Sequence, residues 1–187
     1  MSLLPIVIAP DRRLKTPCKP VEQIDDSIRD LLQNMLETMY DAPGIGLAAP
    51  QVGSDRRVIV VDVARDGEEP QPHCMINPEI TWASDELILM NEGCLSLPEI
   101  YVDIERPDKV RVTYQDQHAA AHEIEADGLF ARCIQHEIDH LDGVLHVDYL
   151  SRIKRELILR KLAKHKPALL AEQAEKRAGK SPQKKAS

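Results

Sequence analysis

The chain has 187 residues, of which 43% are hydrophobic and only 3% aromatic, so we expect one domain with an appended element and a largely aliphatic core. The formal net charge of −7 divides into −16 for residues 1–150 and +9 for residues 151–187, which marks the C-terminal stretch as a separate electrostatic unit. The sequence shows no run of eighteen apolar residues, no secretory leader and too few cysteines for a disulfide scaffold. We therefore expect a cytoplasmic protein with reduced thiols. Neither a membrane nor specific DNA is expected as its partner.

The first predicted element is a helix within DDSIRDLLQNMLETMYDAPG, residues 25–44. Its apolar residues recur at the three- and four-residue spacing of one helix face, so this helix is expected to pack against the core. Asp25 or Asp26 is a suitable N-cap, and Pro43 with Gly44 ends the pattern. The apolar face consists of Ile28, Leu31, Leu32, Met35, Leu36 and Met39.

Short segments with the composition of β-strands follow, separated by Pro, Gly, Asn and Asp. RVIVVDV, residues 57–63, is predicted to be a buried strand. The spacing between strand and turn signals favours mostly antiparallel sheets over repeated βαβ units. The remaining predicted strands are INPEI (76–80), ELILM (86–90), YVDIE (101–105), KVRVTYQD (109–116) and HEIEAD (122–127).

A second helix is predicted from near Gly128 to about Leu141, and it contains the sequence HEIDH. His136 and His140 lie on the same helix face, about 6 Å apart along the axis, and can reach one divalent cation. Glu137, directly after the first histidine, is suited to act as a general base toward an attacking water, as in the H-E-x-x-H pattern. The alternative is an ordinary helix with exposed polar side chains.

Two histidines leave a catalytic metal site incomplete, because such sites usually take three protein ligands. Candidates after the helix, such as His146 and Asp148, are weak. Cys133 shares the helix face, but its Cα lies about 7 to 8 Å along the axis from the metal position. A cysteine side chain plus a metal–sulfur bond of about 2.3 Å spans less than that, so Cys133 is expected to pack beside the site. The remaining thiol in a distinctive segment is Cys94, within NEGCLSLPE.

A third helix is predicted from Ser151 in SRIKRELILRKLAKH, and from about Pro167 onward polar residues and Ala dominate. The last ten residues or so are expected to be frayed or disordered. We therefore divide the chain into a domain of residues 1–150 and a basic C-terminal helix with a flexible tail, residues 151–187. The elements together predict an α+β fold, with mostly antiparallel β-sheets around a central HExxH helix, an N-terminal helix and a C-terminal helix. The apolar stripe of the third helix consists of Ile153, Leu157, Ile158 and Leu162.

Three segments, GIGLAAPQ (44–51), EGCLS (92–96) and QHEIDHLDG (135–143), occur in the order and spacing of a known enzyme family. With them the chain resembles the peptide deformylases of bacterial type over roughly residues 5–150. The resemblance implies a metal-dependent hydrolase that removes the N-formyl group from the N-terminal methionine of newly synthesised proteins and releases formate. The combination of three segments is far more specific than any one of them.

The resemblance also implies roles for individual residues. Cys94, His136 and His140 would hold one divalent metal ion, Fe²⁺ in the cell, with Zn²⁺, Ni²⁺ or Co²⁺ as alternatives. Glu137 would transfer protons, while the side-chain amide of Gln51 and the backbone N–H of Leu95 would donate to the oxyanion. The residues expected to contact or border the substrate are Gly44, Ile45, Gly46, Glu92 and Cys133.

Some positions depart from the commonest family pattern. Arg132 stands where an apolar residue is expected, and its aliphatic stem is predicted to line the pocket for the substrate methionine, with the charge at the rim. Tyr101 occupies a place where some members carry Arg near the bound peptide, and His146 replaces a usually apolar residue. Glu92 has a second interpretation, since it is a candidate to support the site by pairing with Arg106.

The expected substrate is a formyl-Met nascent peptide, and the basic C-terminal helix is a candidate for binding the ribosome. The alternative for this helix is a solvated amphipathic helix that caps the domain. A zinc endopeptidase uses the same HExxH, but GIGLAAPQ and the upstream position of Cys94 disfavour it. A non-catalytic metal-binding homologue would need a fourth protein ligand or loss of the base, whereas Glu137 and Gln51 are both present.

Overall fold

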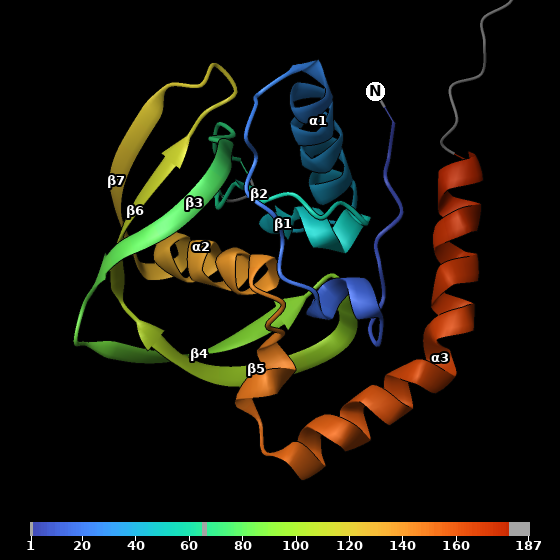
Figure 1. Ribbon diagram of the computed structural model, residues 1–187. Helices are drawn as coiled ribbons and strands as arrows, with labels where there is room; N and C mark the ends of the chain where they lie inside the picture. The colour runs from blue at the N-terminus through green and yellow to red at the C-terminus, as the bar shows by residue number, and fades with distance from the viewer. Residues whose placement is uncertain (1, 65–66, 180–187) are drawn as a thin grey trace, which may run out of the picture.

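The structure, a computed structural model, describes residues 2–64 and 67–179 (Figure 1). Within these residues the chain forms three α-helices, two β-sheets and three short 3-10 helices. The helices are α1 (Asp26–Asp41), α2 (Gly128–Leu141) and α3 (Arg152–Gly179), and the 3-10 helices are η1 (Arg12–Lys15), η2 (Ala49–Val52) and η3 (His146–Tyr149). The strands are β1 (Gly46–Ala48), β2 (Val58–Val61), β3 (His73–Ala83), β4 (Leu87–Cys94), β5 (Leu97–Pro107), β6 (Lys109–Gln115) and β7 (Ala121–Asp127).

Five strands form one sheet in the order β1-β2-β3-β6-β7, and β4 pairs with β5 in a separate two-stranded sheet. All of these strand pairs are antiparallel, which confirms the predicted α+β class. The segments predicted to be strands correspond to β2 through β7. The sequence does not predict β1, because this strand is only three residues long and exists through its pairing with β2, for example Gly46 with Val61.

Helix α1 forms where the sequence predicts it. The Asp25 side chain caps the helix by accepting a hydrogen bond from the Ile28 backbone N–H at 3.2 Å. Leu32 and Met35, on the predicted apolar face, are buried against β1 and β2. The helix ends at Asp41, so the chain leaves it directly into the segment that leads to β1.

Helix α2 lies between the two sheets (Figure 1). The orientation of α2 about its own axis is set by its apolar side, because burial of each Ile or Leu side chain stabilises the fold by about 2 kcal/mol through the hydrophobic effect. The polar side chains Arg132, His136 and His140 are thereby directed toward β4 and β5. The apolar side of α2 and the sheet residues that it contacts are Ala131, Ile134, Ile138 and Leu141 with Ile59, Val61, Met75, Val110 and Val112.

The segment before α1 connects distant parts of the chain. The Val7 N–H donates to the Gln51 carbonyl oxygen at 2.7 Å, and the Ala9 N–H donates to the Ser96 carbonyl oxygen at 2.9 Å. Ile8 between them is fully buried. This segment therefore holds η2 and the turn between β4 and β5 at a fixed separation.

Helix α3 follows one side of the molecule and bends part-way along its length (Figure 1). It continues through Pro167 to Gly179, well past the segment from which it was predicted, and a proline inside a helix favours such a bend. Most of the tail predicted to be frayed lies outside the described residues. In the part of the chain that the structure describes, no helix combines the length and apolarity needed to cross a membrane.

The predicted apolar stripe of α3 is wrong for two of its four residues. Ile153 and Leu157 are 73% and 60% exposed, whereas Leu162 is buried and Ile158 packs beside it. The stripe that contacts the body is displaced around the helix and also includes Leu159 and Leu169.

Candidate active site

A cavity of about 440 Å³ opens between α2, the residues that lead into β1, and the turn that follows β4. This volume is in the range of small-ligand sites, about 300 to 1,000 Å³. Every residue predicted for the site lines the cavity except His140, which lies behind it with 1% of its surface exposed. The three sequence motifs therefore meet at one place.

Three potential metal ligands converge at the inner end of this cavity. Cys94 is the last residue of β4, and His136 and His140 lie on successive turns of α2. Their ligand atoms all lie within 4.8 Å of one another, and the Cys94 Sγ is 3.2 Å from the His140 Nε2. A sulfur and a nitrogen bound to one tetrahedral ion lie about 3.6 Å apart, so this ligand set fits a divalent metal of the zinc or iron type.

His136 is oriented by Glu92, which lies two residues before Cys94 on β4. The Nδ1–H of His136 donates to the Glu92 Oε2 at 2.9 Å, which leaves Nε2 for a metal. Glu92 also accepts hydrogen bonds from Arg106, at 2.7 and 3.1 Å, and from Arg132, at 2.6 Å. Both carboxylate oxygens are thus occupied by protein groups, which favours the supporting role for Glu92 over contact with substrate.

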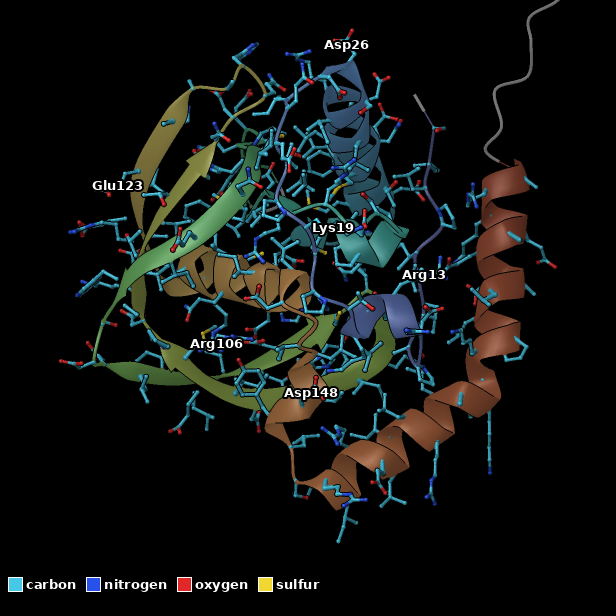
Figure 2. All side chains as sticks on the ribbon, in the orientation of Figure 1. Arg13, Lys19, Asp26, Arg106, Glu123 and Asp148 are labelled. Atoms are coloured by element: carbon cyan, nitrogen blue, oxygen red, sulfur yellow. The ribbon has the colours of Figure 1, made fainter. Side chains whose placement is uncertain are left out.

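The charges around Glu92 are buried together. Burial alone would raise the pKa of Glu92, but hydrogen bonds from His136 and Arg106 outweigh it and lower the pKa to about 2. Figure 2 shows Arg106 between β5 and α2, where it also pairs with Asp139 at 2.8 Å. The carboxylate is therefore ionised, and the guanidinium groups around it are compensated.

The position of Arg132 differs from the expectation. Its charge is not at the rim of the cavity: the side chain is buried, and its guanidinium donates to Glu92 and to the carbonyl oxygens of Ile104 and Ile88. The physical reason is the Glu92 carboxylate, which attracts the guanidinium inward and provides a compensating charge. The residue still lines the cavity, as predicted for its aliphatic stem.

The Gln51 amide has a defined orientation. Its Oε1 accepts a hydrogen bond from the Ala48 backbone N–H at 2.7 Å, which turns the Nε2 toward Cys94 Sγ at 3.5 Å and Ser96 Oγ at 3.3 Å. Leu95, directly after Cys94, lines the same cavity in the two-residue turn between β4 and β5. The Gln51 amide therefore lies beside the potential metal ligand Cys94, where a donor of an oxyanion hole is expected, and the predicted second donor, the Leu95 backbone N–H, belongs to a residue of the same cavity.

Glu137 is buried, and its Oε2 has no hydrogen-bond partner within the described residues. Burial raises the pKa of Glu137 to about 7, close to the value at which a carboxyl can both accept and donate a proton at neutral pH. Gly46 makes room for it, because a Cβ at this position would clash with the Glu137 Oε1. An unpaired buried carboxylate oxygen facing a cavity is suited to a reacting water or substrate.

The other predicted residues surround this centre. The Cys133 thiol donates to the Ile45 carbonyl oxygen at 3.4 Å and is not part of the ligand group, as helix geometry predicts. Tyr101 is 69% exposed, with its ring against Gly93. His146 is buried, with its Nε2 3.2 Å from the Ile100 carbonyl oxygen.

Several residues that line or contact the site were not predicted from the sequence. Met90 and Leu129 contribute large, partly exposed apolar side chains to the cavity, and Ser96 contacts the Gln51 amide. Ser96 belongs to the EGCLS segment, so its position was a usable signal. Met90 and Leu129 resemble any other apolar residue in the sequence, and only the fold brings them to the cavity.

Comparison with known proteins gives a consistent result. The family model described as polypeptide deformylase matches residues 3–156. The peptide deformylase of Methylocella silvestris is 55% identical over 185 residues, covering 97% of this chain and 93% of the relative. That of Phenylobacterium zucineum is 53% identical over 168 residues, covering 90% of this chain and 99% of the relative.

Solved structures agree with these relatives. The crystal structure of peptide deformylase from Ehrlichia chaffeensis in complex with actinonin has a TM-score of 0.84 and 44% identity, covering 88% of this chain and 98% of that one. The crystal structure of a peptide deformylase from Legionella pneumophila has a TM-score of 0.82 and 40% identity, covering 97% of this chain and 100% of that one.

Proposed function

Because the chain belongs to the polypeptide deformylase family, a family of metal-dependent hydrolases that remove the N-formyl group from nascent peptides, we propose that Cys94, His136 and His140 hold its metal ion. The convergence of these three ligand atoms beside the unpaired Glu137 Oε2 is the observation that supports this assignment most strongly. When bound, a divalent ion supplies Lewis-acid activation of water and of the formyl carbonyl.

We propose Fe²⁺ as the ion in the cell, with Zn²⁺, Ni²⁺ or Co²⁺ as functional alternatives. One thiolate and two imidazoles suit all of these ions, so availability decides among them more than ligand type does. An Fe²⁺–thiolate site predicts that activity declines in air and is retained under anaerobic handling. The test is formate release after purification in parallel with and without oxygen.

The reaction adds water to the formyl carbon, breaks the C–N bond, and gives formate and a free amine. Glu137 accepts a proton from the attacking water and passes one to the leaving nitrogen, which its raised pKa suits. The Gln51 Nε2 and the Leu95 backbone N–H donate to the oxygen that becomes negative in the transition state. Glu92 keeps His136 in the tautomer whose Nε2 is available as a ligand.

The segment Gly44 to Gly46 is proposed to border the substrate backbone. In the strand order of the five-stranded sheet β1 comes at one end, so it is an edge strand, and an extended peptide can add to such an edge. The formylated methionine side chain then enters the part of the cavity lined by Met90, Leu129 and Cys133. This pocket is apolar enough for methionine because the Arg132 charge is turned away toward Glu92.

The decisive test is the variant Glu137→Gln, measured for metal content and for formate release from formyl-Met-Ala-Ser. We expect full metal content and a loss of activity of at least about 100-fold, the lower end of general acid–base contributions. Near wild-type activity would contradict the role of Glu137. Cleavage of internal peptide bonds without formate release would favour the endopeptidase alternative.

We propose that residues 1–150 make up the catalytic part and that residues 151–187 form a basic appendage that works in the cytoplasm near the ribosome. The +9 charge of this stretch supports attraction to rRNA. Lys166 is a poor probe, because its Nζ bonds to Pro10 O and Asp11 and holds α3 in place. Charge reversal at exposed Lys154, Arg160 and Lys164 should weaken ribosome co-sedimentation, and unchanged binding would reject this partner.

A further inference from the structure

A second, larger hollow adjoins the catalytic cavity. It measures about 710 Å³ and lies between α3, the N-terminal residues and the rim of the cavity. The N-terminal segment runs beside the second half of α3 (Figure 1), and residues from both line the hollow. The two hollows share one rim, which consists of Ala42, Pro43, Leu95, Pro98, Glu99 and Ile100.

The order of residues along the β1 edge points from the reactive groups toward this second hollow. Gly46 lies against Glu137, and Gly44 lies against the Leu95 side chain, as the atoms nearest to a Cβ at each position show. Ala42 and Pro43, the next residues outward, belong to the shared rim. A peptide that pairs along this edge with its formyl group at Glu137 is therefore directed across the rim.

The hollow has an apolar base and a charged border. Leu4, Ile6, Leu162 and Leu169 provide the apolar surface. Lys161, His165, Lys176 and Arg177 lie along the α3 side, and Glu172 pairs with Lys176 at 2.6 Å. This mixture of apolar surface and both charge signs suits a polypeptide segment of varied sequence better than a small anion or a lipid.

The α3 side is held in place by specific contacts. The Ile6 N–H donates to the Gln173 Oε1 at 3.2 Å, and Lys166 donates to the Pro10 carbonyl oxygen at 2.8 Å. The groove therefore exists before any peptide arrives, which reduces the entropy cost of binding.

We propose that the groove between α3 and residues 4–6 binds the part of the substrate polypeptide that follows its first few residues. The occupant is an extended peptide chain with apolar side chains directed toward Leu162 and Leu169. This inference rests on the deformylase function proposed above and extends it from a formyl-methionine site to a site that also selects for peptide length.

The first experiment compares kcat/KM for formyl-Met-Ala-Ser with that for a formylated decapeptide that begins with the same residues and continues with apolar ones. We expect the decapeptide to be about fivefold better, which corresponds to about 1 kcal/mol of added binding. Leu169→Asp should remove this length advantage and leave the tripeptide rate unchanged. The matched control is Leu170→Asp, on an exposed side chain outside the groove, which should keep the advantage.

The second experiment does not depend on a substituted protein. A decapeptide with benzoylphenylalanine at its sixth position is photolysed with the wild-type enzyme, and the labelled residues are found by mass spectrometry. Labels within residues 161–177 or 4–6 are expected. Labels elsewhere, or equal kcat/KM values for the two peptides with the wild-type enzyme, would overturn the groove proposal. Failure to deformylate even the tripeptide would instead contradict the proposed function.

Discussion

At the scale of single residues, the most consequential group is Glu92, since one buried carboxylate compensates Arg106 and Arg132 and orients His136. Its side chain is 5% exposed, as is that of Arg106. Removal of one partner from such a buried network leaves uncompensated charge, which costs more than a single hydrogen bond. The site's ligand geometry and the stability of the fold therefore depend on the same residue.

Glu92→Gln is expected to destabilise the protein by about 3 kcal/mol and to weaken metal affinity by about 10- to 100-fold. Urea unfolding and metal titration measure the two effects. Glu105→Gln, on the same strand as Arg106 but exposed, is the control and should change neither. A variant with wild-type metal affinity would show that His136 is oriented by other contacts.

Asp148 makes stability depend on pH. It accepts hydrogen bonds from Lys15 Nζ at 2.6 Å and from the Leu145 N–H at 2.7 Å, near the end of α2. Burial would raise the pKa of Asp148, but the hydrogen bonds from Lys15 and Leu145 outweigh it and keep the pKa below the ordinary 3.8.

Because the folded-state pKa is lowered, this stabilisation is present above about pH 4 and is lost as the pH falls below the ordinary aspartate value. Asp148→Asn should cost about 1 kcal/mol at neutral pH, and the difference from wild type should shrink on acidification. Urea unfolding across this pH range measures it. A difference that stays constant down to about pH 3 would contradict the assignment.

At the scale of elements, two variants of α3 test which contacts hold this C-terminal helix against the body of the molecule. Periodicity predicted Ile153, Leu157, Ile158 and Leu162 as packing residues, and of these four Ile158 and Leu162 contact the body while Ile153 and Leu157 are exposed. We expect Leu162→Ala to cost about 2 to 3 kcal/mol and Leu157→Ala to change stability by less than about 0.5 kcal/mol. Unfolding curves of the two variants measure both changes in stability. Equal losses of stability would contradict the assignment and would mean that the Leu157 side chain is covered in solution.

The same scale shows what local sequence can and cannot predict. α1, α2 and the long strands have strong periodic patterns and terminal signals, so their positions follow from the sequence. β1 and the rotation of α3 depend on partners distant in the chain, such as Val61 for Gly46, and no local pattern contains that information. The convergence of Cys94 on the HExxH helix was predicted through the family resemblance, because spacing alone left the third ligand open; the inward charge of Arg132 was not predicted.

At the scale of the whole molecule, the proposed metal-ligand set joins two elements. Cys94 ends β4 and the histidines belong to α2, so a bound ion cross-links the two-stranded sheet to the central helix. Metal removal by a chelator should therefore abolish formate release and also lower the Tm, because an ion that binds only the folded state stabilises it.

Two cysteine variants sharpen this prediction. Cys94→Ser should lose the metal and show the low Tm of the chelated protein, whereas Cys133→Ser should retain the metal, since Cys133 is outside the ligand group. Metal analysis and thermal unfolding of both proteins measure the outcome. Metal loss from Cys133→Ser alone would reverse the assignment of the two thiols.

The hydrogen bonds from Val7 to Gln51 and from Ala9 to Ser96 have a consequence for the order of biosynthesis. Residues made first are tied to partners made much later, and the proposed metal ligands come from β4 and from α2, two elements far apart in the chain. The cavity therefore cannot assemble progressively as the chain emerges from the ribosome. With Cys94, His136 and His140 as the proposed ligands, a newly made copy cannot hold its metal until His140 has been translated, about three quarters of the way along the 187-residue chain.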